Sequence, residues 1–147
     1  MLYLYKKVRI ISEVFYWKEK LHIRNFLFGI DNNTKYVGYV CGANSKTPHL
    51  FLNIKQLLKD TYEENVATIF HEFGHIEHRT IYRNNKQQIK AEILAEKYAL
   101  KQLKKYLPKA YKKHIKDWKV CLQKPNWRKE YPIHYKAFSQ IKAYQED

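Results

Sequence analysis

The sequence predicts an α+β fold in which a small antiparallel or mixed sheet of about three strands packs on two long helices, followed by a helical C-terminal extension. Three observations lead to this prediction. Short strand-like runs fill residues 23–54, two amphipathic helical patterns occupy residues 62–78 and 88–107, and basic helical segments continue to the C-terminus. The 147 residues suit a single domain, with its core at about residues 10–107 and the extension at residues 108–147.

The N-terminal segment is predicted to lead into a helix. Residues 1–9 form either a short strand or a lead-in, whereas residues 10–22 place apolar side chains at helical spacing. The apolar residues of the first seven precede the lysines, which is the wrong order for a signal peptide, and the run is too short to cross a membrane. We therefore expect a cytoplasmic protein without membrane contact. Cys41 and Cys121 lack metal-ligand spacing and are expected to be reduced thiols.

Three strand-like runs come next and predict an antiparallel meander. They extend from Ile23 to Ile30, from Lys35 to Cys41 and from His49 to Ile54. Residues 31–34 are rich in turn-forming side chains. Gly38 inside the second run indicates either a bulge or the close approach of another group. Residues 55–60 are expected to form a short helix or a turn.

The long helix that follows is predicted to begin with a capping box, in which Thr61 is the N-cap and Glu64 lies three residues later. One side of this helix carries an apolar stripe, and His71 and His75 fall nearly opposite to it. The helix therefore buries one face and turns both histidines elsewhere. The stripe consists of Val66, Ile69, Phe70, Phe73 and Ile76.

Residues 71–75 read His-Glu-Phe-Gly-His, an H-E-x-x-H pattern. On a helix His71 and His75 lie one above the other, where two imidazoles can bind one Zn²⁺. Glu72 is rotated to the side and can reach a metal-bound water, which suits a general base. The alternative is a pair of polar residues on a solvated face.

The second helix supplies a candidate third ligand. The pattern from Gln88 to Leu107 has a broad apolar face, and Glu92 and Glu96 lie inside it. Carboxylates are rarely buried unless they are paired or bound to a metal. Glu92 as a ligand would leave a fourth zinc position open, and Glu96 could accept a hydrogen bond from a ligating histidine. Alternatively, both carboxylates pair with Lys or Arg at the edge of the helix.

The motif and the second helix together resemble a known pattern. The run His71-Glu-Phe-Gly-His75, followed by Glu92-Ile-Leu-Ala-Glu-Lys-Tyr-Ala99, is similar to the gluzincin pattern H-E-x-G-H … E-x-x-A-[DEN]-x-[FY]-A. Small bacterial and phage zinc peptidases, including the ImmA/IrrE family, carry this pattern. The resemblance covers about residues 36–107, and Glu96 stands where the family usually has Asp or Asn.

The resemblance implies a zincin-like fold and a metalloprotease with one Zn²⁺ per chain. It implies that His71, His75 and Glu92 are the metal ligands, that Glu72 is the catalytic base, and that another backbone packs closely at Gly74. In such peptidases the substrate adds to an edge strand beside the cleft, here the run 49–53 or the run 36–40. The expected substrate is an intracellular protein, and by analogy it is a repressor or another DNA-associated protein of a phage or mobile element.

Peptide hydrolysis at such a site usually needs another hydrogen-bond donor for the oxyanion that develops on the substrate. The candidates are His78, Tyr82, His134 and Tyr135, and the spacing favours none of them. His78 lies about 10 Å along the helix from His71 and is too far to share the metal. Residues 79–86 read as a loop between the two helices.

The C-terminal extension is basic and aromatic. Residues 110–123 are predicted to be helical, residues 126–134 irregular and residues 135–145 helical again. The net charge of the chain is +14, which suits contact of a basic face with DNA or RNA but also arises from solvated lysine-rich helices. The alternative to a peptidase is therefore a nucleic-acid-binding module whose zinc site is structural or vestigial.

Overall fold

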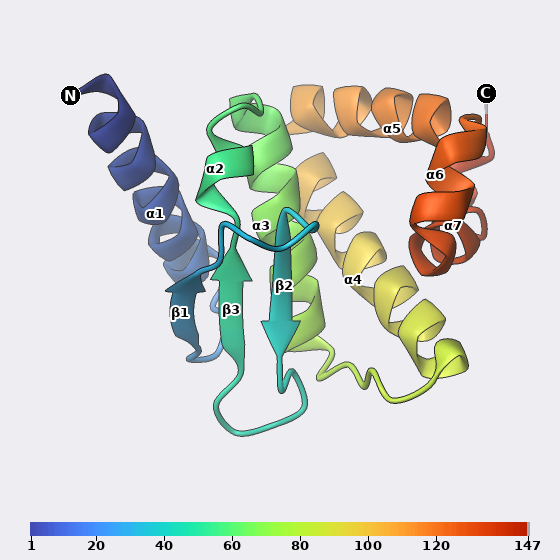
Figure 1. The fold of residues 1–147 in the computed structure, drawn as a ribbon, viewed down its shortest axis with the longest axis horizontal. Helices are drawn as coiled ribbons and strands as arrows, with labels where there is room; N and C mark the ends of the chain where they lie inside the picture. The colour runs from blue at the N-terminus through green and yellow to red at the C-terminus, as the bar shows by residue number, and fades with distance from the viewer. Residues whose placement is uncertain (147) are drawn as a thin grey trace.

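The computed structural model describes residues 1–146, which form an α+β structure with a small mixed sheet (Figure 1). The N-terminus and the C-terminal helices lie at opposite ends of the long axis (Figure 1). Within residues 1–146, no helix combines the length and the hydropathy needed to cross a bilayer. The elements in chain order are α1 (Leu2–Lys20), β1 (Leu27–Ile30), β2 (Gly38–Cys41), β3 (His49–Leu52), α2 (Ile54–Leu57), α3 (Tyr62–Glu77), α4 (Asn85–Tyr106), α5 (Pro108–Leu122), α6 (Pro125–Glu130), α7 (Pro132–Phe138) and a 3₁₀ turn, η1 (Lys142–Tyr144).

The sheet has the strand order β1-β3-β2, so the prediction of an antiparallel meander is wrong. β3 pairs with β1 in parallel and with β2 antiparallel. β3 takes the centre because it carries fully buried side chains, Leu50 and Leu52. The connection from β1 to β2 passes the end of β3, where the Asn53 side chain donates to the carbonyl of Thr34 at 3.0 Å. β2 is consequently an edge strand and β3 is not.

Residues 2–9 are helical, so neither the short strand nor the lead-in predicted for residues 1–9 is correct. α1 begins at Leu2 and buries Ile10, Val14 and Trp17, as the spacing predicted for residues 10–22. Its first two turns extend beyond the sheet (Figure 1) and leave apolar side chains such as Leu4, 62% exposed, in solvent. The sequence pattern there is mixed because no core partner selects one face.

Prolines define the C-terminal helices. Pro108, Pro125 and Pro132 each stand in the first turn of a helix, where the missing N–H is not needed. The segment 126–134, predicted to be irregular, therefore lies mostly in α6 and α7. The last helix was predicted over residues 135–145, but α7 ends at Phe138 and η1 follows. The first prediction was wrong because prolines begin α6 and α7, and the second was wrong because α7 begins at Pro132 and ends at Phe138.

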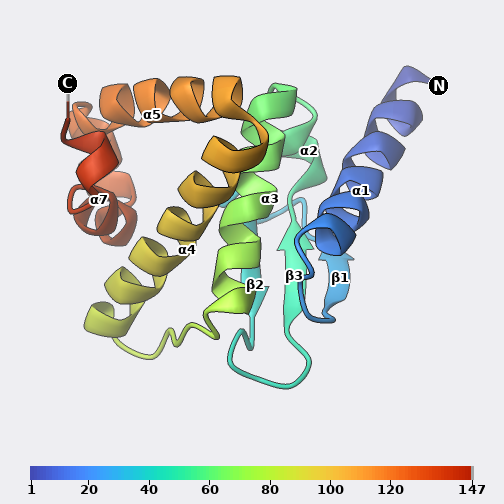
Figure 2. The ribbon, with the colours of Figure 1, turned by 180° about the vertical axis from the view of Figure 1, so that it is seen from behind.

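Helix α3 lies at the centre of the molecule. It covers one face of the sheet, and α4 packs along its other side, as the view from behind shows (Figure 2). Thr61 is the N-cap, accepting from the Glu64 N–H at 3.2 Å as predicted, but the Glu64 carboxylate lies beside Lys113 at 3.4 Å. The C-terminal elements pack on α4 through a second apolar cluster, whose buried residues are Leu100, Ala137, Phe138, Ile141 and Tyr144.

Candidate metal centre

Helices α3 and α4 bring His71, His75 and Glu92 together. Each offers one ligand atom, and these atoms all lie within 4.8 Å of one another, so the group could hold a metal ion. The two Nε2 atoms face the same carboxylate: His71 Nε2 lies 2.9 Å from Glu92 Oε2, and His75 Nε2 lies 3.3 Å from Glu92 Oε1. Glu92 is only 3% exposed, so its carboxylate is turned inward from the apolar face of α4.

The convergence depends on how closely the two helices pack. A Cβ built on Gly74 would lie 2.6 Å from the carbonyl oxygen of Ala95, which confirms that another backbone approaches this glycine. Ala91, Ala95 and Ala99 form the buried stripe of α4 that faces α3. Small side chains on both sides thus bring the helix axes together, and Glu92 reaches across to the histidines.

The Nδ1 atoms of both histidines are held by other groups. His75 Nδ1 lies 2.9 Å from Thr80 Oγ1, and His71 Nδ1 lies 3.6 Å from Glu96 Oε2. An N–H at Nδ1 donating to these oxygens leaves the Nε2 lone pair free for a metal. Two nearby oxygens thus favour the tautomer that a metal ligand needs.

Glu96 is buried, 1% exposed, and its partners are histidines and not Lys or Arg. Its Oε1 accepts from His114 Nε2 of α5 at 3.2 Å. Burial alone would raise the pKa of Glu96, but the two histidines outweigh it and lower this pKa to about 2. Glu96 is therefore an anion that joins α5 to the His71 ring.

Glu92 and His71 hold each other in their charged forms. Burial opposes the charge of the His71 ring, but the carboxylates of Glu92 and Glu96 outweigh it and raise the pKa of His71 well above 6.5. Burial likewise opposes ionisation of Glu92, and the imidazoles of His75 and His71 keep its pKa well below 4.5. A cation at this position would replace the imidazolium proton as the partner of the carboxylate.

Glu72 lies beside His71, His75 and Glu92 but is not part of that group. Its side chain is buried, and Oε2 has no hydrogen-bond partner among the described residues. Burial raises its pKa above 4.5. Gly38 of β2 leaves room for it, since a Cβ there would lie 3.2 Å from Glu72 Cγ. Gly38 therefore marks a close approach and not a bulge.

The structure brings two of the four candidate donors to this centre. His134 of α7 places Nε2 3.3 Å from Glu92 Oε2, and the Tyr82 hydroxyl donates to Glu92 Oε1 at 2.6 Å. His78 lies instead against the ring of Tyr98, with centroids 6.2 Å apart. Tyr135 contacts the guanidinium of Arg128. Neither His78 nor Tyr135 lines the cavities at the centre.

Two cavities meet at the centre, with volumes of about 630 and 550 Å³. The residues that line both are Tyr36, Gly38, His71, Glu72 and His134. The larger cavity extends toward α5, α6 and α7, and the smaller one extends toward the loops that follow β1 and β2. Glu72 consequently stands where the linings of the two cavities meet.

Sequence reasoning missed Thr80 and His114. Thr80 follows His75 by five residues and reaches it only because the chain turns back after α3, where the Thr80 N–H donates to the His75 carbonyl. His114 lies eighteen residues after Glu96 and meets it through the crossing of α4 and α5. No local pattern marks either residue, because both contacts depend on tertiary packing.

The two cysteines, Cys41 and Cys121, are unpaired, in agreement with the expectation of free thiols. Comparisons of the chain with protein-family models, curated proteins and solved structures found no match. The function of this chain is therefore inferred from the side chains around Glu72.

Proposed function

We propose that the chain is a zinc-dependent endopeptidase with a zincin-like active site. One observation carries the proposal: the Nε2 atoms of His71 and His75 and the carboxylate of Glu92 converge beside Glu72, a buried carboxylate with an unpartnered oxygen. A purely structural metal site does not require a buried, unpartnered carboxylate such as Glu72 beside the metal ligands. A hydrolytic site needs a base at that position.

The donor set suits zinc. Two imidazole nitrogens and one carboxylate are the protein ligands of many catalytic zinc sites, which keep the fourth position open. His134 is not in the group of three, although its Nε2 lies 3.3 Å from Glu92 Oε2, and we assign the fourth position to water or substrate. Zinc bound there would lower the pKa of a coordinated water toward about 7 and polarise the carbonyl of the peptide bond.

The chain's own residues supply the proton transfers. Glu72 accepts a proton as the water attacks the peptide carbonyl and then passes that proton to the leaving amine. Burial raises the pKa of Glu72, which makes its carboxylate a stronger base for the first transfer. Of the four candidate donors, we assign oxyanion stabilisation to His134, which lines both cavities beside Glu72. Tyr82 and His134 both contact Glu92, but Tyr82 lines only the smaller cavity, so we assign to Tyr82 the orientation of that carboxylate.

The edge of the sheet provides a place for the substrate backbone. β2 pairs with β3 on one side, and within residues 1–146 no strand pairs with its other side. Gly38 of this strand also lines the cleft. A peptide bound along β2 would gain main-chain hydrogen bonds and place one carbonyl at Glu72. We infer an intracellular protein substrate, such as a repressor or another DNA-associated protein.

The test compares the wild type with Glu72→Gln, Glu92→Ala and the control Glu63→Gln, which changes a glutamate in the first turn of the same helix. Zinc content and cleavage of a peptide library are measured for each. Glu72→Gln should keep the metal and lose roughly 10²–10⁴-fold in turnover, since it removes only the base. Glu92→Ala should lose the metal, and Glu63→Gln should match the wild type. Full turnover by Glu72→Gln would refute the proposal.

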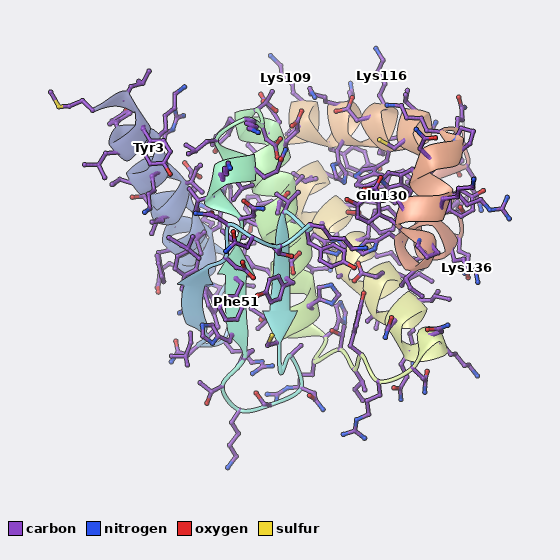
Figure 3. All side chains as sticks on the ribbon, in the orientation of Figure 1. Tyr3, Phe51, Lys109, Lys116, Glu130 and Lys136 are labelled. Atoms are coloured by element: carbon purple, nitrogen blue, oxygen red, sulfur yellow. The ribbon has the colours of Figure 1, made fainter. Side chains whose placement is uncertain are left out.

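A second candidate function is suggested by the surface of α5. Lys109, Lys112, Lys116 and Lys119 follow one another at helical spacing, and Lys109 and Lys116 point away from the body of the protein (Figure 3). Such a stripe suits contact with a phosphate backbone. Replacing Lys109, Lys112 and Lys116 by Gln should weaken binding of a random-sequence DNA and flatten its salt dependence, with zinc content unchanged. If the variant binds DNA with the same salt dependence as the wild type, these lysines do not contact DNA and serve only as a solvated surface.

A further inference from the structure

The larger cavity has an aromatic wall built by the C-terminal extension. Trp118 of α5, Trp127 of α6, Phe138 of α7 and Tyr131, between α6 and α7, line it. The Trp118 ring lies edge-on to Trp127, with centroids 4.9 Å apart, and to Phe138, with centroids 4.8 Å apart. Rings held by such mutual contacts form a rigid apolar surface. We call this cavity, as lined by these four residues, the aromatic pocket.

The aromatic pocket is not an ordinary gap in the core. It opens to solvent and has a volume of about 630 Å³. That volume falls within the roughly 300–1,000 Å³ of ligand-binding pockets. It also reaches Glu72 and His71 directly, so an occupant would touch the catalytic centre.

Outside the metal centre, where Glu72 and Glu96 lie, the charged side chains that line the aromatic pocket balance one another. Lys113 lies between Asp117 at 2.7 Å and Glu64 at 3.4 Å, which neutralise it. Lys35 lies 5.2 Å from the ring centroids of both Tyr36 and Tyr131. With Lys124 and Asp60, this part of the lining has three positive and three negative side chains. This balance favours a neutral occupant over a charged one.

The smaller cavity differs in character. Oxygen- and nitrogen-bearing side chains line it beyond the shared residues, including Asp31, Asn33, Thr34 and Asn44. A peptide whose carbonyl lies at Glu72 would extend into both cavities, because the two meet there. The two sides of the cut bond would therefore meet different chemistry.

We propose that the aromatic pocket is a specificity site that takes a large apolar side chain, aromatic above all, from the substrate residue next to the cleaved bond. Burying one aromatic ring removes roughly 150–250 Å² from water, which this wall can cover. The smaller cavity takes polar residues on the other side of the bond. This inference rests on the proposed peptidase function, but the pocket can also be tested without turnover.

The first experiment narrows the pocket. Val120 lies on its wall and is 50% exposed, so Val120→Trp adds a ring at the mouth without disturbing the core. Lys116→Trp is the matched control, since it adds the same ring to an exposed position of α5 outside the pocket. Zinc-loaded enzymes are given peptides that differ only in carrying Phe, Leu, Ala or Lys beside the cut bond. The wild type should prefer Phe over Ala roughly 10–100-fold in kcat/KM.

The second experiment needs neither zinc nor turnover. Cys121 lines the aromatic pocket and Cys41, on β2, does not. Modification of each thiol by iodoacetamide is followed by mass spectrometry, with and without N-acetyl-phenylalaninamide or N-acetyl-alaninamide. The phenylalanine amide should slow the modification of Cys121 and leave that of Cys41 unchanged. The alanine amide should protect neither thiol.

The outcomes separate the two proposals. A preference for Phe that Val120→Trp reduces roughly tenfold and Lys116→Trp retains supports the pocket. Cleavage without aromatic preference, or a preference that Val120→Trp leaves unchanged, overturns the pocket and keeps the peptidase. Protection of Cys121 without cleavage of any peptide keeps the pocket as an aromatic-binding site and refutes the peptidase. If no peptide is cleaved and Cys121 is not protected, both the pocket and the peptidase proposals are overturned.

Discussion

A Cβ built on Gly74 would lie 2.6 Å from the carbonyl oxygen of Ala95 and 2.7 Å from its Cα, so α3 and α4 meet backbone to backbone beside the metal group. Gly74 lies between His71 and His75, and Ala95 lies three residues after Glu92. The contact therefore sets the distance across which the carboxylate reaches both imidazoles. Glycine is needed here for space, since its φ lies in the ordinary helical range.

Gly74→Ala should destabilise the protein and weaken zinc binding. Alanine has a helix propensity about 1 kcal/mol better than that of glycine. The new Cβ, however, would clash with backbone atoms of Ala95, which cannot rotate away as a side chain can. Such overpacking costs roughly 1–3 kcal/mol. We expect a net loss that lowers the midpoint of thermal unfolding by a few degrees, with a larger loss in zinc affinity. Calorimetry with and without zinc measures both. Lys97→Ala, at an exposed position of α4, is the control, and a variant more stable than wild type would contradict the close packing.

Gly38→Ala should impair turnover while leaving zinc bound. A Cβ at Gly38 would lie 2.9 Å from Leu52 Cδ2 and 3.2 Å from Glu72 Cγ, so the base must shift. A misplacement of this kind costs roughly tenfold to 10²-fold in kcat/KM. Steady-state kinetics and zinc content are the measurements. Gly29→Ala makes a similar clash with the Phe51 ring on β3 and should affect stability but not kcat/KM; equal kinetic losses in both variants would point to general damage of the sheet.

Thr80→Val should lower zinc affinity by roughly 10–100-fold, because the valine cannot accept the hydrogen bond that orients the His75 ring. The contact between His75 Nδ1 and Thr80 Oγ1 measures 2.9 Å and is buried. Competition with a chelator of known affinity gives the magnitude. Thr80→Ser keeps the hydroxyl and should restore binding, so a serine variant as weak as the valine variant would assign the loss to packing.

Zinc binding should release a proton and strengthen as the pH rises. Burial opposes the charge of His71, but Glu92 and Glu96 outweigh it and raise its pKa well above 6.5, so the metal-free protein holds a proton that zinc must displace. Zinc affinity should therefore increase up to about tenfold per pH unit between pH 6.5 and the raised pKa. Calorimetric titration in two buffers of different ionisation enthalpy counts the protons released.

The chelator-treated protein gives the opposite pH dependence. A group whose pKa is raised by folding stabilises the protein fully below its unfolded pKa and loses this contribution as the pH rises through the folded value. The His71 contribution is thus complete below pH 6.5 and declines above it. Thermal unfolding of His71→Gln beside wild type, both free of metal, isolates it. A wild type that gains stability relative to this variant as the pH rises would contradict the assignment.

The local parts of the site were predictable from neighbouring residues. The i, i+4 spacing of His71 and His75 places both rings on one helix face wherever the helix lies. The polar Glu92 and Glu96 within the apolar face of the next helix indicated that carboxylates would be buried there, and both are. The Thr61 cap also needed no tertiary information, because it is satisfied within one turn.

Tertiary packing determined what sequence patterns did not reveal. β1 pairs in parallel with β3 because β3 occupies the buried centre of the sheet. The residues of one strand do not indicate which other strands lie beside it. For the same reason, the sequence left the edge strand open between residues 36–40 and 49–53, and the strand order assigns it to β2. The sequence pattern did not reveal α6 or the first turn of α7, because a proline begins each of them.

The sequence by itself therefore determined the side chains available to this site: two imidazoles, a carboxylate between them and another carboxylate one helix later. Only the tertiary structure decided that these groups converge, that Thr80, His114 and Tyr82 hold them, and that His134 and the aromatic wall of α5–α7 complete the cleft. The physical reason is range. Helical periodicity and capping act over a few residues, whereas the close approach of Gly74 to Ala95 and the crossing of α5 over α4 depend on how whole helices pack.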